Sequence, residues 1–173
     1  MARIDSHQGR ATADFETSRL YSGMEGWQKS FGDTVAYYRF DFARTAWDDL
    51  YDEVTGAGRV YQSPIQLNCQ HVTLFPGPQE WDNAGAYKSA ALRAIVSYEV
   101  YTQSGMVTPD IHMQRYDFDR LVYKDHVYRI TQVNDEGQLQ ERPTVVSIDA
   151  LQLRNDELVE DVQFADYANR PIL

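Results

Sequence analysis

The sequence of 173 residues has a single cysteine, Cys69, so the chain cannot form an internal disulfide. It also lacks any run near the ~18 apolar residues that a membrane-spanning helix needs. Its first ten residues have no apolar centre of the kind that a signal peptide requires. We therefore expect no contact with a membrane, synthesis in the cytoplasm, and a core that packing alone holds together.

Basic residues are scarce as well, and only Lys29, Lys88 and Lys124 are lysines. The chain has 16 Lys and Arg residues against 26 Asp and Glu residues, which gives a formal net charge of −10. Because tight wrapping of nucleic acid depends on cations that neutralise phosphates, this charge argues against such binding. The excess of Arg over Lys and the 12 Tyr residues suit protein interfaces instead.

No recognisable catalytic motif is present. The chain has neither the Gly-x-Ser-x-Gly of a serine nucleophile nor the Gly-x-x-x-x-Gly-Lys of a phosphate-binding loop. The histidines are scattered, whereas a closed zinc site needs four converging nitrogen or sulfur ligands. They are His7, His71, His112 and His126. We expect no catalytic residue, no metal site and no cofactor.

Cys69 and His71 are two residues apart, which on one continuous strand would place both side chains on the same face. A thiol nucleophile would also need a third group and an exposed cleft, and no such group is evident. Cys69 stands near the apolar Leu67, Val72 and Leu74. We interpret it as a small buried hydrophobe.

Acidic residues are concentrated in two places, residues 48–53 and residues 156–161. The first group lacks the spacing of a calcium-binding loop. A pair of carboxylates suffices for glycoside hydrolysis, but any chain with 26 acids contains such pairs. We interpret residues 48–53 as a solvated loop, with a cation site and a catalytic pair as alternatives. Its acids are Asp48, Asp49, Asp52 and Glu53.

The chain divides into three regions. Residues 1–33 are polar and without sustained periodicity, and we expect an extended N-terminal arm that becomes ordered against other subunits. Residues 34–154 carry the strand patterns and are expected to form a β-rich core with inserted loops. Residues 155–173 form an acidic C-terminal tail.

Strand patterns in the core region predict a mainly β fold, either a small antiparallel barrel or a sandwich with long loops. Ile65, Leu67 and Cys69 alternate clearly with polar residues, whereas the Ala-rich residues 86–96 keep a helix as the alternative. Residues 76–78 and 134–137 are expected to break or turn the chain. The strand segments are 34–42, 59–75, 91–101, 120–123, 127–133 and 143–153.

A tight hairpin gives the strongest local signal. The period-two segments Arg120–Tyr123 and Val127–Val133 are separated by only Lys124, Asp125 and His126. We interpret His126 as a turn residue.

Three passages together resemble the neck proteins of tailed bacteriophages, a group that includes head-completion, head-closure and stopper proteins. The order of the passages along the chain carries the similarity. They are Tyr38–Phe40 running into Asp48–Glu53, then Val60–Leu67, and finally Asp117–Tyr123 followed by His126–Ile130.

The resemblance implies a structural role in the neck of the virion, with no enzymatic activity. Such proteins form a ring beneath the portal, seal the packaged DNA and offer a docking surface to the tail. The implied ring is dodecameric, or hexameric for a tail terminator, and its partners are portal, adaptor and tail proteins, with DNA only in non-specific proximity. The alternatives are a tail terminator or another tail or adaptor protein and, in other classes, an OB-like nucleic-acid-binding module or a small hydrolase.

Acidic loops are the expected lining of such a ring's channel. Like-charge repulsion would keep the duplex mobile, because no phosphate contact has to be broken as the DNA moves. Residues 48–53 and Asp156–Asp161 are the candidates to face the channel.

Overall fold

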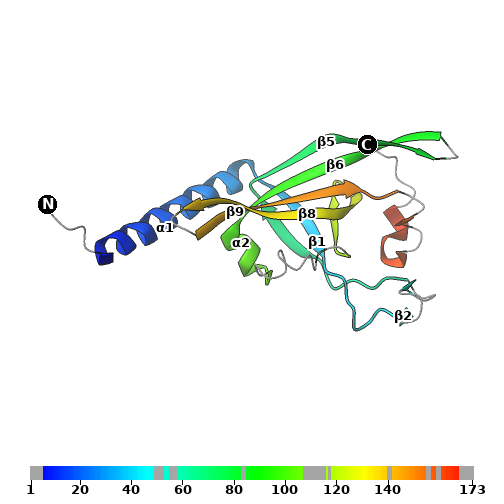
Figure 1. Cartoon of the computed structure of the whole chain (residues 1–173), viewed down its shortest axis with the longest axis horizontal. Coiled ribbons are helices and arrows are strands. Elements are labelled where there is room, and N and C mark those ends of the chain that lie inside the picture. The colour runs from blue at the N-terminus through cyan, green and yellow to red at the C-terminus, as the bar shows by residue number, and fades with distance from the viewer. Residues whose placement is uncertain are drawn as a thin grey trace.

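The computed structural model describes the backbone of residues 6–48, 53–54, 58–82, 85–106, 116, 118–139, 142–154, 157–158 and 161–167. Seven strands form one antiparallel sheet in the order β4-β1-β7-β8-β9-β6-β5, which confirms the predicted mainly β fold (Figure 1). These strands are β1 (Asp33–Tyr38), β4 (Ile65–Cys69), β5 (His71–Asp82), β6 (Gly85–Ser97), β7 (Arg120–Tyr123), β8 (His126–Leu139) and β9 (Arg142–Gln152).

Shorter elements complete the fold. Strands β2 (Trp47–Asp48) and β3 (Glu53–Val54) pair with each other outside the main sheet. Helix α1 (Ser6–Phe31) precedes the sheet, α2 (Tyr98–Gln103) follows β6, and the 3-10 helix η1 (Val162–Tyr167) lies near the end of the chain. Helix α1 projects from one end of the elongated molecule, and β2–β3, η1 and the tip of β5–β6 lie at the other (Figure 1).

The sheet curls until its two edges approach each other. Edge strands β4 and β5 are consecutive in the chain, with only Gln70 between them. The backbone N–H of Gln70 donates to the carbonyl oxygen of Ile95 in β6, with an N···O distance of 2.7 Å. No ladder joins β4 to β6, both of which are fully described, so the sheet does not close into the barrel that was one of the two predicted architectures.

Strand alternation decides which face of the sheet is buried. In β4, Leu67 and Cys69 are buried while Gln66 and Asn68 are exposed, as the sequence pattern predicts. Helix α2 packs on the same interior, since Tyr101 belongs to this core. The largest fully buried side chains of the core are Val35, Leu67, Leu92, Val96, Met106, Leu121, Tyr128, Val146 and Ile148.

Residues 6–31 form a helix, whereas the sequence indicated an aperiodic arm. The segment has no proline, so nothing in it breaks a helix. Its larger side chains fall on two different sides. Thr17, Tyr21 and Met24 are buried or half-buried, while Phe15 and Trp27 are exposed. Two overlapping faces conceal the helical period in the sequence.

Helix α1 is fastened to the sheet by side-chain hydrogen bonds. The Tyr21 hydroxyl donates to the carbonyl oxygen of Pro143 in β9 at 3.1 Å. Directly after the helix, Asp33 Oδ2 accepts a hydrogen bond of 2.6 Å from the Tyr123 hydroxyl. Burial, together with this carboxylate, raises the pKa of Tyr123 to about 12. The helix therefore has a defined direction relative to the core.

Gly32, between α1 and β1, is held close to two carbonyl groups. A Cβ at this position would lie 2.4 Å from the carbonyl oxygen of Gln28 and 2.6 Å from that of Cys69. Because both oxygens belong to the backbone, Gly32→Ala has to displace α1 from β4. We expect the free energy of unfolding to fall by about 1–3 kcal/mol in urea titrations. Gly23→Ala is the control, since its Cβ would meet nothing within 4 Å, and an equal loss in both variants would contradict this account.

Strands β5 and β6 form a hairpin. Their pairing continues past residues 76–78, where the sequence predicted a break. The ladder register shifts between Pro76 and Gln79, which marks a bulge. Proline is tolerated there because β5 is an edge strand and one side of it needs no ladder donor. Residues 86–96 are therefore strand and not helix, while Tyr98–Tyr101, predicted to continue the strand, belong to α2.

The β7–β8 hairpin is confirmed, with a tighter turn than predicted. Lys124 and Asp125 have φ values of 47° and 65°, the positive pair that a type I′ turn requires. His126 already belongs to β8 and pairs with Tyr123, so it is not a turn residue. The predicted turn at 134–137 also lies within β8, which stays paired with β9 past that point.

Candidate functional site: an apolar face on helix α1

Helix α1 has one side against the body of the molecule. Thr17 is buried, and Tyr21, Met24 and Gln28 are half-buried. These residues are spaced by four, three and four, so they lie on one side of a helix with 3.6 residues per turn. This side accounts for the packing of α1 within the chain.

A second side of α1 carries large apolar side chains that remain in solvent. Leu20, Trp27 and Phe31 are 40%, 57% and 70% exposed. The Trp27 and Phe31 rings contact each other, with 4.8 Å between their centroids. A helix that only covered its own core would be polar here. We call Leu20, Trp27 and Phe31 the apolar α1 face.

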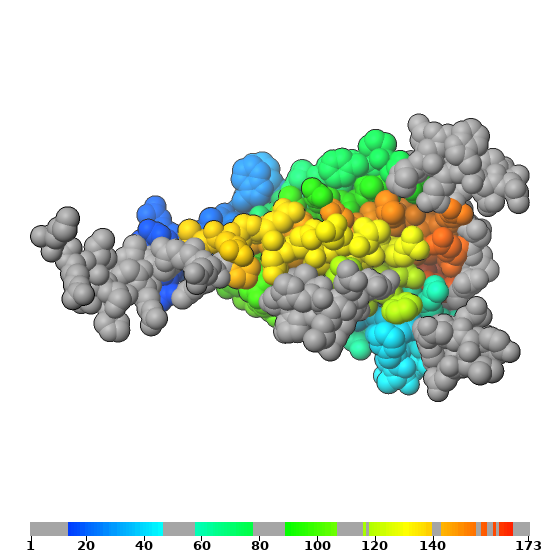
Figure 2. Space-filling view, in the orientation of Figure 1, coloured from blue at the N-terminus to red at the C-terminus, as the bar shows by residue number. Residues whose placement is uncertain are grey.

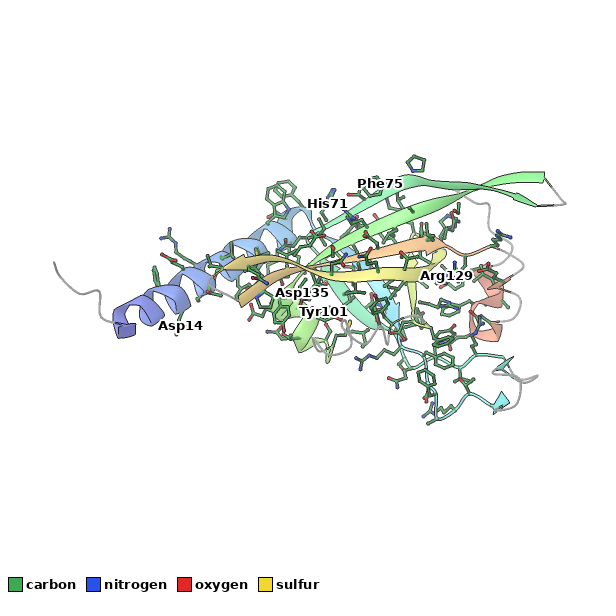
Figure 3. The ribbon with its side chains drawn as sticks, viewed as in Figure 1. Asp14, His71, Phe75, Tyr101, Arg129 and Asp135 are labelled. Carbon is green, nitrogen blue, oxygen red and sulfur yellow. The ribbon has the colours of Figure 1, made fainter. Side chains whose placement is uncertain are left out.

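The β5 edge, next to the C-terminal end of α1, also carries exposed apolar side chains. Leu74 and Phe75 are exposed on this strand. Figure 3 places His71, at the start of β5, near the C-terminal end of α1, with Phe75 farther along the same edge. Side chains near the end of α1, in light blue, stand out from the molecular surface in Figure 2. Large exposed apolar groups gathered in this way mark an interaction surface.

A groove separates α1 from the junction of β4 and β5. Its volume is about 440 Å³, and its lining includes Leu20, Gly23, Met24, Trp27 and Gln70. The amide Nε2 of Gln70 is buried and has no hydrogen-bond acceptor in the described structure. The groove therefore combines apolar walls with a donor that lacks a partner.

A buried charge cluster lies at the opposite end of the molecule, under η1. Asp161 has no exposed surface, and its Oδ2 is 3.5 Å from Arg120 Nε. Its Oδ1 is 3.4 Å from Arg59 Nη1, and the Tyr61 hydroxyl donates to Oδ2 at 3.1 Å. Burial raises the pKa of Tyr61 well above its usual range, so this hydroxyl stays protonated. Three side chains from two segments, residues 59–61 and β7, hold this carboxylate and fasten the C-terminal region to the sheet.

A second buried carboxylate, Asp119, is also fully engaged by its own chain. The Tyr37 hydroxyl donates to Oδ2 at 2.6 Å, and the backbone N–H of Phe40 donates to Oδ1 at 2.8 Å. Burial raises the pKa of Asp119, while these hydrogen bonds oppose the rise. Asp119 lines a pocket of about 220 Å³ with Phe42 and Tyr116, but both of its oxygens already have donors. The arrangement positions β1 and offers no free base.

The residues singled out in the sequence are dispersed. Cys69 is buried, as predicted for a small core residue, and burial raises the pKa of its thiol to about 12. His71 is exposed, because the strand is interrupted at Gln70, so the expectation of a shared face with Cys69 was wrong. His126 Nδ1 lies 3.2 Å from Gln152 Nε2. His7 has no described side chain, and His112 lies outside the described residues.

The two acidic groups differ in outcome. Residues 49–52 lie outside the described residues, so the prediction for residues 48–53 stays a prediction. Asp161 was a candidate to face a channel, and its complete burial excludes that role. A local acidic run could not reveal this, because the arginines that pair with Asp161 are 41 and 102 residues away along the chain.

The described part of the chain offers neither a metal-binding cluster nor a membrane-spanning helix. Within it, no three His, Cys, Asp or Glu residues are placed to hold a metal ion. No helix there is both long enough and apolar enough to cross a membrane.

Comparisons with solved structures show a distant likeness to a virion chain. No protein-family model matches the chain, and no curated protein matches its sequence. A chain in a solved structure described as "Virion of native gene transfer agent (GTA) particle" is similar at a TM-score of 0.43 with 11% sequence identity. The match covers 70% of this chain and 94% of that chain. A likeness this distant assigns neither a fold nor a role.

Proposed function

We propose that this chain is a structural protein of a tailed-phage-type virion and, within it, a ring-forming subunit of the head-to-tail connector. The observation that carries the proposal is the apolar α1 face on a helix that projects from the sheet. A monomer gains nothing from exposing Trp27 and Phe31, whereas a subunit buries them on assembly. The sequence resemblance to neck proteins is the reason for proposing a virion and, within it, the head-to-tail connector.

Ring closure needs one surface of a subunit to pack against a different surface of the next. The α1 end and the β2–β3 end point in opposite directions, which suits contacts that repeat around an axis. A dodecamer in a stopper, or a hexamer in a tail terminator, is the proposed state. Portal, adaptor and tail proteins are the proposed neighbours above and below the ring.

The charge of the chain supports a channel that does not grip DNA. A net charge of −10 per subunit repels phosphates, so a duplex meets few contacts that must be broken as it passes. Since Asp161 is buried, the acidic candidates for the channel lining are residues 48–53 and the other acids of residues 156–160.

Assembly through the α1 face is tested with the double variant Trp27→Asp/Phe31→Asp. We expect the wild-type protein to sediment as a ring, alone or with its portal and tail partners, and the variant to sediment as a folded monomer. Two carboxylates at the contact would have to be desolvated on association. Sedimentation velocity measures the mass, and circular dichroism verifies the fold.

Ser22→Asp provides the matched control for this test. Ser22 is exposed on the same helix, about 140° around the axis from Trp27 at 100° per residue, so its variant should still form the ring. A wild-type protein that stays monomeric with all partners present would refute the proposed function. Electron cryomicroscopy of intact particles then distinguishes stopper from terminator by position and copy number.

A further inference from the structure

We infer that the backbone of a second copy of this chain packs directly onto α1 at Gly23 and Gly26. This inference rests on the proposed function, because it names the partner of the apolar α1 face and the point of closest approach.

Packing within the described part of the chain does not require glycine at positions 23 and 26. A Cβ at either position would meet nothing within 4 Å, and neither residue has a positive φ. Each glycine nevertheless weakens the middle of a helix relative to alanine, because it loses more backbone freedom on folding. Gly32, by contrast, is required by packing within its own chain, because a Cβ there would collide with the carbonyl oxygen of Cys69. Close approach by another backbone is the physical reason that remains for glycine at positions 23 and 26.

The groove beside Gly23 indicates what kind of group approaches. Its walls are the apolar side chains of Leu20, Met24 and Trp27, which suit the side chains of another protein. Gln70 also lines the groove, and its buried amide Nε2 has no hydrogen-bond acceptor in the described structure, so a carbonyl oxygen is the group that this side chain lacks. A polypeptide supplies both apolar side chains and carbonyl oxygens.

The size of the surface fits a subunit interface. Helix α1 has 26 residues, which at ~1.5 Å per residue gives a length of ~39 Å and, at ~10 Å width, a side of ~400 Å². A stable interface buries ~800 Å² on each partner, so α1 alone supplies half. The neighbouring β5 edge adds exposed apolar side chains at Leu74 and Phe75, which lie on opposite faces of the sheet because they are adjacent in the strand.

Charge favours a second copy as the occupant. Arg19 lines the groove and makes no ion pair with any residue in the described part of the chain. An arginine without an ion pair on a protein of net negative charge is suited to pair with a carboxylate of an acidic partner. Another copy, with 26 acidic residues against 16 basic ones, has that character.

The double variant Gly23→Ala/Gly26→Ala tests the inference, because it should raise the stability of the monomer and weaken assembly of the ring. Alanine favours the helix, so the monomer should gain roughly 4–8 °C in its unfolding midpoint. Two methyl groups at the contact should weaken ring assembly at least ~10-fold, because they keep the partner backbone away. Monomer stability is measured in the Trp27→Asp/Phe31→Asp background, and assembly is measured by sedimentation in the otherwise wild-type chain.

Ser18→Ala/Ser22→Ala is the matched control. Both serines are exposed on α1 outside the groove, so these changes raise helix propensity without touching the contact, and the ring should form as in the wild type. Rings of the glycine double variant as tight as wild-type rings would overturn the close approach while leaving the proposed function intact. A loss of monomer stability in the glycine variant would also overturn it, by showing a role inside the chain. A wild-type protein that never assembles would contradict both the proposed function and the glycine contact.

Discussion

Ile130→Asp is expected to prevent folding of the domain. Ile130 lies on the inner face of β8, has almost no exposed surface, and belongs to the main core. A carboxylate there is surrounded by the apolar side chains of this core, so it either stays charged at a high desolvation cost or takes up a proton. We expect a loss above ~4 kcal/mol, which is comparable with the whole stability of an ordinary domain. Circular dichroism and urea titration measure it.

Arg129→Asp is the control at the preceding position of the same strand. Arg129 is exposed, so the same aspartate should change the free energy of unfolding by less than about 0.5 kcal/mol. Val127→Asp should behave like Ile130→Asp, because Val127 is buried in a separate apolar cluster that includes Phe164 of η1. A folded Ile130→Asp protein of near wild-type stability would contradict the placement of the core.

Asp161→Ala is expected to have the second-largest effect. The substitution leaves Arg120, whose side chain is only 4% exposed, without its carboxylate partner. Removing one member of a buried ion pair costs about 3–5 kcal/mol, because the remaining charge stays desolvated. The Tyr61 hydroxyl loses its acceptor as well. Urea unfolding measures the loss, and hydrogen exchange should show that residues 161–167 lose protection first.

Two further variants identify the cause of that loss. Asp166→Ala removes an exposed carboxylate from the same 3-10 helix and should be nearly silent. The double variant Arg120→Met/Asp161→Leu should lose less than the sum of the two single changes, by at least ~1 kcal/mol, because no uncompensated charge remains. Additive losses would show that the ion pair does not couple these segments.

Features with a short period were predictable from the sequence. The alternation of Leu67 and Cys69 with polar residues places them inside β4, and the spacing around Lys124–Asp125 permits only a tight hairpin. These signals are local, because a strand's two faces are set by every second residue and a turn by two or three. The mainly β fold and the burial of Cys69 follow from the same patterns.

The candidate site depended on contacts that no local pattern reports. Residues 6–31 appear aperiodic because the body side of α1 and its exposed apolar face overlap in the sequence. Only the position of α1 against β4 and β9 shows which side is unpaired, and therefore that Trp27 and Phe31 form a surface. The sequence by itself placed them in a polar arm.

The acidic tail illustrates the same division. Its charge is a property of the sequence, but the burial of Asp161 follows from Arg120 and Arg59, which the folded sheet brings to it from distant positions. Pro76 in β5 is similar, since the sequence marks a break, whereas the location of β5 at the sheet edge permits a strand. Composition and period determined the strands of this protein and which of their faces is buried. The tertiary structure decided which charges are paired and which apolar groups remain in solvent, because those outcomes depend on residues far apart in the chain.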